Sequence, residues 1–445
     1  MEIKILEAAW ILPITAPPIK NAGVLIAGAH IEAIAKSEKL PAILAGKNCV
    51  RHNYGQAIIV PGFINLHTHL EYTILQSLSV EGGLLAWLPR LMDVTAGWSQ
   101  RDRLDSIQQG IKEVIAAGTT FIVDNSYDGA SVRAIAQAGL RGLVGLELFG
   151  VDQSLSDRQW QRWQERLEKE LEDQVVKQAR KERRLDITVA PHAPYTVCPA
   201  LWQQAQQWAK VNDQIVLTHL AESAAEKKWF DAAECELTQF LIEAFGRIDP
   251  DFGNSYKEKL IWKEGSKSPV EHLHKHGLLE NNLLAAHAVH VNDQDIDLLK
   301  ANTVAIAHCP RSNARLDCGR VPLGKLLKSG LRVGLGTDSK ASNDDLDLLA
   351  EARFAINWHK EQEPALEMEP RQIIERLTIK AAACLNREHD LGSLAPGKLA
   401  DIAVFALSED KNWSESNDDP YDLLLQGRVK LQALFVNGAE IEVFN

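Results

Sequence analysis

The chain has 445 residues, of which 45% are hydrophobic and 24% are charged, and its formal net charge is −12. These proportions are ordinary for a globular protein, and an acidic balance without a dominant basic patch argues against a nucleic-acid or anionic-membrane partner. The length exceeds what one hydrophobic core usually fills, so we expect one large domain and one smaller domain.

The start of the chain predicts a small β-rich unit. Residues 1–60 consist of short apolar stretches separated by Pro and Gly, which is typical of short strands and turns. No basic segment followed by an apolar one opens the chain, so no secretory signal is expected, and no apolar run reaches the roughly 18 residues of a membrane span. The cysteines form no C-x-x-C pair, which favours free thiols and a cytoplasmic location.

The middle of the chain, residues 61–390, alternates apolar β-type runs with segments of helical period. The predicted strands are Phe63–His69, Thr119–Asn125, Gly142–Phe149, Leu185–Ala190, Ile215–His219, Leu283–His287, Thr303–His308 and Leu331–Gly336. Eight such βα units favour an α/β fold closed into a (β/α)₈ TIM barrel. A doubly wound open sheet is the alternative, but no G-x-G-x-x-G motif opens a helix after the first strand.

Three segments of the middle region predict surface features. Residues 155–184 are rich in Gln, Glu, Lys and Arg, which favours one long exposed helix. Residues 245–268 contain Pro and Gly with little periodicity, which favours a surface loop inserted after the fifth strand. The histidines of the run Glu271-His-Leu-His-Lys-His are expected on an exposed helix face.

The end of the chain resembles its beginning in pattern. Residues 398–405 and 431–438 are strand-like, and Asn437-Gly438 is a turn signal. We therefore expect residues 1–60 and 391–445 to pair into one small β-sandwich domain outside the barrel.

Four metal-binding side chains follow predicted strands of the barrel. His67 and His69 end the first strand, two residues apart and hence on one face of it. His219 ends the fifth strand and Asp338 follows the eighth. Because active sites of such barrels lie at the carboxyl ends of the strands, these groups are predicted to hold one divalent ion and leave a position for water.

Two further residues are candidates for moving protons. Glu222 lies three residues after His219, where it could carry a proton between the water and a leaving group. His287 ends the sixth strand and is predicted to contact the same water or the tetrahedral intermediate, with His290 as its competitor.

Polar residues at other strand ends are candidate substrate contacts. His192, between Pro191 and Pro194, follows the fourth strand and is predicted at the rim of the site. Arg311 and Asn313, with His308 and Ser312, follow the seventh strand, where they could line the pocket or cap the loop.

Several motifs together resemble the amidohydrolase superfamily. They are Pro61-Gly-Phe-Ile-Asn-Leu-His-Thr-His, His219-Leu-Ala-Glu, Ala286-His-Ala-Val-His, Ala307-His-Cys-Pro-Arg-Ser-Asn, Gly336-Thr-Asp-Ser-Lys-Ala-Ser-Asn and Gly392-Ser-Leu-Ala-Pro-Gly-Lys-Leu-Ala-Asp. Within the superfamily they are similar to the branch of cytosine deaminase, the triazine chlorohydrolases and the methylthioadenosine/S-adenosylhomocysteine deaminases. The resemblance covers nearly the whole chain, and its motifs specify the superfamily more closely than the substrate.

The resemblance implies a distorted (β/α)₈ barrel that holds one divalent metal ion, with Zn²⁺ favoured over Fe²⁺. His67, His69, His219 and Asp338 match the metal ligands. Glu222 matches the proton shuttle, His287 matches the water-orienting histidine, and Asp338 is also expected to take the proton of the water. His192 matches a substrate-contacting histidine of the purine-nucleoside deaminases.

The chain departs from this branch at two positions. Where the methylthioadenosine/S-adenosylhomocysteine deaminases carry a ribose-binding glutamate, this chain has Thr95. Glu71 follows His69 closely, as in relatives that resemble aminodeoxyfutalosine deaminases, and is predicted either to contact an amino group of the substrate or to pair with Arg311 or Arg315.

The predicted reaction is hydrolytic deamination of a small heterocycle. Metal-bound hydroxide would add to a carbon that carries an exocyclic amine, and Glu222 would protonate a ring nitrogen and then the departing ammonia. Purine nucleoside-like, aminodeoxyfutalosine-like and cytosine-like substrates all remain open, as does assembly into a homo-oligomer. The alternative is displacement of halide or cleavage of an amide bond, but the presence of Glu222 favours an amine leaving group. A non-catalytic relative would have lost a ligand, and none is lost.

Overall fold

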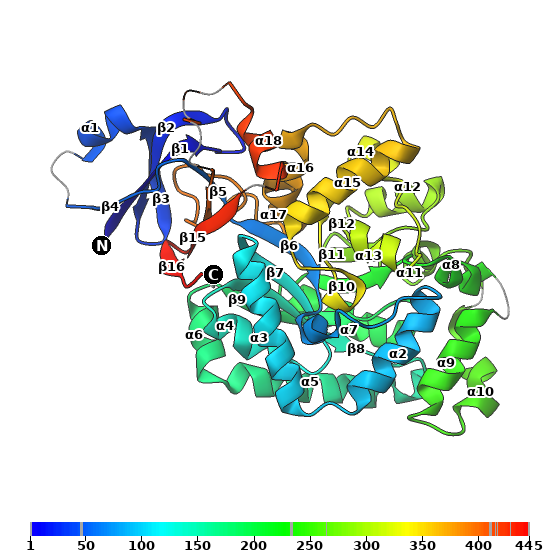
Figure 1. Cartoon of the computed structure of the whole chain (residues 1–445). Coiled ribbons are helices and arrows are strands. Elements are labelled where there is room, and N and C mark those ends of the chain that lie inside the picture. Colours follow the sequence, from blue (N-terminus) through cyan, green and yellow to red (C-terminus); the bar gives the residue numbers. More distant parts are fainter. Residues whose placement is uncertain are drawn as a thin grey trace.

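The computed structural model describes residues 2–44, 48–231, 235–263, 265–408, 412–413, 415, 417–427 and 429–443. Within these residues, no helix combines the length and the apolar character needed to cross a membrane. Two bodies are visible in Figure 1: a larger one of alternating strands and helices, and a sheet that contains both ends of the chain.

Two parallel sheets form the strands of the larger body. One has the order β6-β7-β8-β9 and the other β10-β11-β12-β13. Their bounds are β6 Phe63–Thr68, β7 Thr119–Ser126, β8 Arg141–Leu148, β9 Leu185–Pro191, β10 Val216–Leu220, β11 Leu283–His287, β12 Ala305–His308 and β13 Arg332–Leu335. Each predicted strand is present with its ends within two residues of the expected ones, because each is a short apolar run that is buried throughout or nearly so.

The two sheets meet at two seams and thereby close the barrel. At the β9/β10 seam, the backbone N–H of His219 donates to the carbonyl of His192 at 2.9 Å. At the β13/β6 seam, the N–H of Asp338 donates to the carbonyl of His67 at 2.9 Å, and Thr68 forms a parallel bridge with Asp338. The predicted TIM barrel is confirmed, as a barrel made of two four-stranded halves.

Helices follow the barrel strands and pack against their outer faces (Figure 1). Between residues 84 and 384 the α-helices are α2 Leu84–Ala96, α3 Gln100–Ala116, α4 Ala130–Gln137, α5 Ser156–Glu172, α6 Gln174–Lys181, α7 Pro199–Val211, α8 Ala224–Asp231, α9 Glu236–Gly246, α10 Phe252–Lys259, α11 Pro269–Lys275, α12 Asp293–Ala301, α13 Pro310–Arg315, α14 Leu323–Ser329, α15 Leu348–Gln362, α16 Pro370–Leu377 and α17 Ile379–Cys384. The barrel interior below the site is apolar and includes Leu66, Val123 and Leu217. The candidate site residues lie above this packed interior, at the carboxyl ends of the strands.

The two ends of the chain share one mixed sheet. Its order is β16-β15-β14-β5-β1-β2-β3, with β4 beside β1. The strands are β1 Ile3–Ile11, β2 Ile19–Ala27, β3 His30–Lys36, β4 Val50–Asn53, β5 Ala57–Pro61, β14 Ile402–Ala406, β15 Lys430–Val436 and β16 Ala439–Ile441. Antiparallel pairing of β5 with β14 joins the ends, as expected, although the strands form one hydrogen-bonded sheet where a sandwich was expected.

A buried ion pair fixes this sheet to the barrel. Arg141, at the start of β8, donates to both carboxylate oxygens of Asp401 at 2.8 and 3.0 Å. Both side chains are almost completely buried. Stacking of Phe63 on Phe405, with ring centroids 5.5 Å apart, adds an apolar contact across the same boundary.

The predicted single helix over residues 155–184 is wrong in one respect. The segment forms two helices, α5 and α6, which separate at Asp173. The Asp173 carboxylate accepts from the backbone N–H groups of Val175 and Val176 and so caps the second helix. Trp163 and Leu167 of α5 are buried, so the segment is amphipathic and covers the barrel with one face.

The predicted loop over residues 245–268 is wrong. The segment contains α10 and a short 3₁₀-helix, Ile261–Lys263, while residue 264 lies outside the described residues. Phe252 and Trp262 are buried, and this tertiary burial outweighs the unfavourable local composition. His272 of α11 is also fully buried rather than exposed, whereas His274 is exposed as expected.

Candidate metal centre

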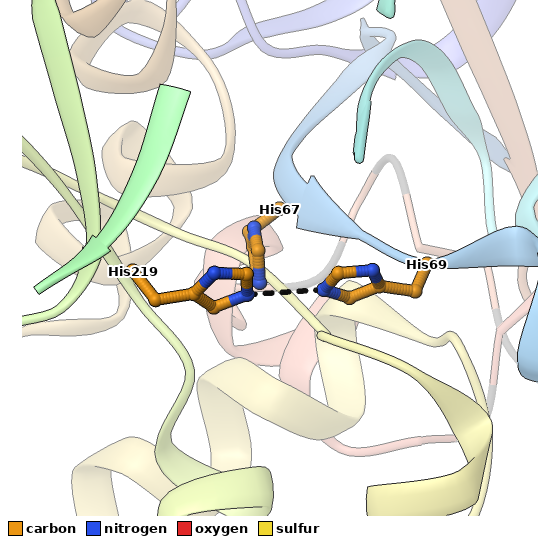
Figure 2. A group of neighbouring side chains, drawn as sticks. All are labelled: His67, His69 and His219. Carbon is orange, nitrogen blue, oxygen red and sulfur yellow. Dashed lines mark hydrogen bonds between the residues drawn. The ribbon is translucent and has the colours of Figure 1, made fainter. Parts of the chain in front are cut away.

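Four of the sequence-predicted residues lie together at the carboxyl ends of the barrel strands. The Nε2 atoms of His69 and His219 are 3.1 Å apart, and the His67 ring lies beside them (Figure 2). An oxygen of Asp338 lies 3.6 Å from Nε2 of His67 and 3.8 Å from Nε2 of His69. The two halves of the barrel contribute two residues each, so the site spans both seams.

The spacing of these atoms fits a small divalent cation. Zinc bonds of about 2.0–2.1 Å in tetrahedral geometry place ligand atoms about 3.3 Å apart. The separations of 3.1, 3.6 and 3.8 Å given above are close to this value. Two groups of possible ligands share His67, one with His69 and His219 and the other with His287 and Asp338, and the ligand atoms of each group lie within 4.8 Å of one another. The donor set of imidazole nitrogens and a carboxylate is the set that zinc prefers.

The protonation of the histidines supports the same interpretation. Burial lowers the pKa of His67 and of His219 below the usual value, and the neighbouring histidines lower it further, so the rings are neutral. Nδ1 of His219 donates to the carbonyl of His192 at 2.8 Å, which leaves a lone pair on Nε2. Nε2 of His67 is buried and has no hydrogen-bond partner among the described residues. Such converging lone pairs repel one another unless a cation lies between them.

The carboxylate of Asp338 is held by hydroxyl groups. Burial alone would raise the pKa of Asp338, but His69, His287 and a hydrogen bond from Ser312 bring the pKa below its usual value. The Ser312 hydroxyl donates to Oδ2 at 2.5 Å, and the Ser342 hydroxyl lies 3.1 Å from the same atom. The backbone N–H of Ser339 donates to Oδ1 at 2.7 Å. These contacts orient the charged carboxylate toward the histidines.

The backbone is strained where three strands enter the site. The φ angles of Ala221, His287 and Asp338 are 53°, 74° and 59°. Residues other than glycine rarely adopt such left-handed conformations, which cost of the order of 1–3 kcal/mol each. The surrounding barrel must therefore enforce these turns, and they direct the side chains that follow the strands into the site.

Glu222 and His287, the two candidates for moving protons, lie side by side. Oε1 of Glu222 is 3.6 Å from Nε2 of His287. Glu222 is 7% exposed, and burial raises its pKa to about 7. A carboxyl group with a pKa near neutrality can both donate and accept a proton.

The orientation of His287 is set by Asn313. Nδ1 of His287 lies 2.9 Å from Oδ1 of Asn313, so the other nitrogen faces Glu222 and Asp338. His290, the competing candidate, instead places Nε2 2.6 Å from the carbonyl oxygen of Cys318. The geometry therefore favours His287 over His290.

His192 lies next to the candidate ligands. Its ring centroid is 4.7 Å from that of His219, and its other face stacks on Phe149, also at 4.7 Å. Nδ1 of His192 lies 3.0 Å from the hydroxyl of Thr196, which fixes the ring.

The remaining predicted contacts, Glu71 and Arg311, are held by other protein groups. Glu71 is buried, accepts from the backbone N–H of Tyr127 at 2.7 Å, and lies 3.6 Å from Arg103. The predicted ion pair of Glu71 with Arg311 or Arg315 is therefore wrong. Arg311 pairs with Asp345 at 2.7 Å and approaches Glu351 at 3.8 Å.

One residue of the site was not anticipated from the sequence. Glu147, on β8, is 3% exposed, and a carboxylate oxygen of it lies within 4.8 Å of ring nitrogens of His192 and His219. Burial, and then the charge of Asp124, raises the pKa of Glu147 to about 8. The signal in the sequence was a single acidic residue inside an otherwise apolar strand, Gly142–Phe149, which an unpaired carboxyl rarely occupies without a role.

Comparisons with known proteins agree with this architecture. The model of the amidohydrolase family matches residues 58–438. A 5-methylthioadenosine/S-adenosylhomocysteine deaminase of Syntrophomonas wolfei is 30% identical over 395 residues, which cover 86% of this chain and 80% of that protein.

Two solved structures share the fold over nearly the whole chain. An adenosine deaminase from Xanthomonas campestris with bound zinc aligns with a TM-score of 0.80 at 23% identity, over 98% of this chain and 92% of that one. The aminofutalosine deaminase of Helicobacter pylori in complex with methylthio-coformycin aligns with a TM-score of 0.78 at 21% identity, over 99% and 100% of the two chains.

Proposed function

Because this chain belongs to the amidohydrolase family, we propose that it is a metal-dependent deaminase, which releases ammonia from an amino-substituted N-heterocycle. The observation that carries the proposal is the convergence of His67, His69, His219 and Asp338 on one point beside Glu222. Buried, neutral imidazoles next to a carboxyl of near-neutral pKa form the constellation that hydrolysis of a polar bond requires.

In this proposal, His67, His69, His219 and Asp338 hold one divalent ion, and zinc fits them better than iron. The bound zinc of the adenosine deaminase from Xanthomonas campestris, which has the same fold, supports this choice. When bound, such an ion lowers the pKa of a coordinated water toward about 7 and polarises the reacting group.

The protein groups would then move the protons. Asp338, kept ionised by its surroundings, accepts a proton from the attacking water. Glu222 would donate its proton to a ring nitrogen of the substrate, pass to the departing amine the proton that Asp338 took from the water, and recover its own proton from the hydroxyl group that becomes the product carbonyl. His287, whose Nδ1–H donates to Oδ1 of Asn313, presents Nε2 to the site as an acceptor and would orient the attacking water through one of its O–H groups.

We propose His192 as the main substrate contact, because its ring lies beside that of the candidate ligand His219 and is fixed by Thr196. Asn313 can reach a ligand through its side-chain nitrogen, which is buried and has no partner among the described residues. Glu71 accepts a hydrogen bond from Tyr127, and Arg311 donates one to Asp345. We therefore propose that these two residues affect substrate binding indirectly, by positioning the loops that they contact. A purine nucleoside-like compound is favoured as substrate because the relatives act on methylthioadenosine and S-adenosylhomocysteine according to their names.

The second candidate function is hydrolysis of a halide or an amide bond on a heterocycle. The same metal-activated water could perform it. Glu222 argues for the deaminase, because a buried acid of raised pKa is suited to protonating an amine that leaves, whereas halide needs no proton.

Ammonia release tests the proposal. The purified, zinc-loaded protein is incubated with adenosine, methylthioadenosine, S-adenosylhomocysteine, cytosine and an aminotriazine, and ammonia is measured by a coupled assay. Release from at least one compound, abolished by Asp338→Asn, is the expected result. Chloride release from a chlorotriazine without ammonia release from any amine would favour the second candidate, and inactivity with every compound would count against both.

A further inference from the structure

Strand β6 changes the direction of its side chains just before the candidate metal ligands. Ile64 and Leu66 point into the barrel interior, where they belong to the apolar cluster below the site. Because side chains alternate along a strand, His67 and His69 would then point outward, toward the helices. Instead, both rings point toward that of His219 inside the barrel (Figure 2). The strand therefore contains one residue more than a regular alternation allows.

A β-bulge accounts for this extra residue. From Asn65 to Thr68, β6 advances by three residues, whereas their partners on β7, Ile122 and Asp124, are two residues apart. Bulges redirect the side chains that follow them and are frequent beside active sites. This bulge turns the two histidines from the outer face of β6 to the inner face.

The segment that follows the bulge is held by the carboxylate of Asp124. Its Oδ1 accepts from the hydroxyl of Thr68 at 2.8 Å and from the backbone N–H of Leu70 at 2.9 Å. These two donors flank His69 in the chain. Asp124 is 1% exposed and Thr68 is fully buried, so water cannot replace the bonds if the carboxylate is removed.

The other side of the same segment is held by the residues that follow β13. The backbone N–H of Asp338 donates to the carbonyl of His67 at 2.9 Å, and Thr68 forms a parallel bridge with Asp338. Asp124 completes this support from the side of β7. A shift of the segment would change the distances among three of the four candidate ligands, His67, His69 and Asp338.

Asp124 does not belong to the candidate ligand set itself. Among the described residues, the groups with the spacing of metal ligands do not include it. Val123 points into the barrel interior, so the next residue of β7 lies on the outer face of the strand. Any effect of Asp124 on a bound ion must therefore pass through the backbone that carries the histidines.

We propose that Asp124 is a positioning residue of the metal centre, which fixes the bulged register of β6 so that His67 and His69 face the ion. The inference rests on the proposed metal-dependent function. It gives a role to a buried carboxylate that the proposed reaction does not use. Loss of this carboxylate should weaken metal binding although all four candidate ligands are kept.

Zinc affinity, measured without substrate by competition with a chromophoric chelator, tests the inference. We expect Asp124→Ala to raise the Kd for zinc about 10- to 100-fold, the range for loss of a group that orients metal ligands. Asp124→Asn keeps an acceptor oxygen for both donors and should stay within about threefold of the wild type.

A matched control separates positioning from a general loss of stability. Ile122→Ala removes buried apolar atoms from the outer face of the same strand. It should lower the Tm of the metal-free protein by as much as Asp124→Ala does, but leave the Kd for zinc within about twofold of the wild type.

Two further arms keep the test decisive. Should Asp124→Ala not fold, Thr68→Val, which removes one of the two donors and keeps the shape, should raise the Kd for zinc about fivefold. Absence of ammonia release from every compound would contradict the proposed deaminase but not this inference, because zinc affinity is measured without turnover. An unchanged Kd in Asp124→Ala, or an equal rise in Asp124→Asn or in Ile122→Ala, would overturn the inference.

Discussion

At the scale of single residues, Glu222 is the group on which proton transfer depends. It lies 3.6 Å from His287, and its backbone N–H donates to Glu226 at 2.8 Å, which holds the start of the following segment. Glu222→Gln preserves shape and burial but cannot release a proton. We expect kcat for ammonia release to fall at least about 100-fold, the range for loss of a general acid, with bound metal unchanged. A variant that keeps most of its turnover would remove Glu222 from this role.

Kinetic measurements can show whether Asn313 contacts the substrate or positions His287. Its oxygen fixes Nδ1 of His287 at 2.9 Å. If positioning dominates, Asn313→Ala should lower kcat about tenfold or more with little change in KM, as for other residues that orient a catalytic imidazole. Asn313→Asp keeps the acceptor oxygen and should recover part of kcat. A rise in KM with unchanged kcat would instead assign Asn313 to substrate binding.

The sequence predicted the groups that directly face the metal site better than the groups that support them. His67, His219 and Asp338 could be found because each lies at the end of an apolar run. Ser312 was considered only as a pocket-lining or loop-capping residue and Ser342 was not considered, because their contact with Asp338 exists only after α13 and the loop following β13 have come together. Glu147 was overlooked because its strand was assigned as core.

At the scale of elements, periodicity located the barrel strands, but tertiary burial decided the helices near residues 245–268. Phe252 and Trp262 have partners only in the folded protein, where Trp262 packs against Trp229 and His272. Local Pro and Gly content therefore predicted a loop where α10 forms.

Strand β6 contains an irregularity that the sequence pattern did not predict. Its register with β7 shifts between Asn65 and Thr68, and a simple alternation of side chains cannot anticipate such a shift.

The buried His272 of α11 makes stability depend on pH. It lies between Phe230 and Trp262, and burial lowers its pKa to about 3. Between pH 6.5 and 3 the unfolded chain binds a proton at this residue that the folded chain does not, so stability falls as the pH falls through this window. The slope contributed by this one group reaches about 1.4 kcal/mol per pH unit.

Replacement of this ring tests the origin of the acid sensitivity. His272→Phe should reduce the fall in the free energy of unfolding between pH 6.5 and 5, measured by urea titration at several pH values. His274→Phe, on the exposed side of the same helix, serves as control. An unchanged slope in His272→Phe would show that the sensitivity arises elsewhere.

At the scale of the whole molecule, the candidate metal centre joins the two halves of the barrel. His67 and His69 come from the sheet β6–β9, and His219 and Asp338 from the sheet β10–β13. The seams between the sheets run through the same residues, at His219 with His192 and at Asp338 with His67. An ion bound there would connect the halves at the point where few backbone hydrogen bonds do so.

Removal of the ion should therefore lower the stability of the fold and also abolish the activity. Binding to the folded state alone adds about 2.7 kcal/mol when the free ion is at 100 times its dissociation constant. We expect a chelator to lower the Tm in differential scanning calorimetry and added zinc to restore it. The variant Glu222→Gln should behave as the wild type does, because it keeps all four ligands.

Metal content measured by mass spectrometry on the purified protein tests the central claim most directly. The account predicts one divalent ion, preferentially zinc, per chain in the wild type and in Glu222→Gln, and loss of most of it in His219→Ala and Asp338→Ala. A wild type that binds no divalent ion after reconstitution, or ligand variants that retain a full equivalent, would contradict it.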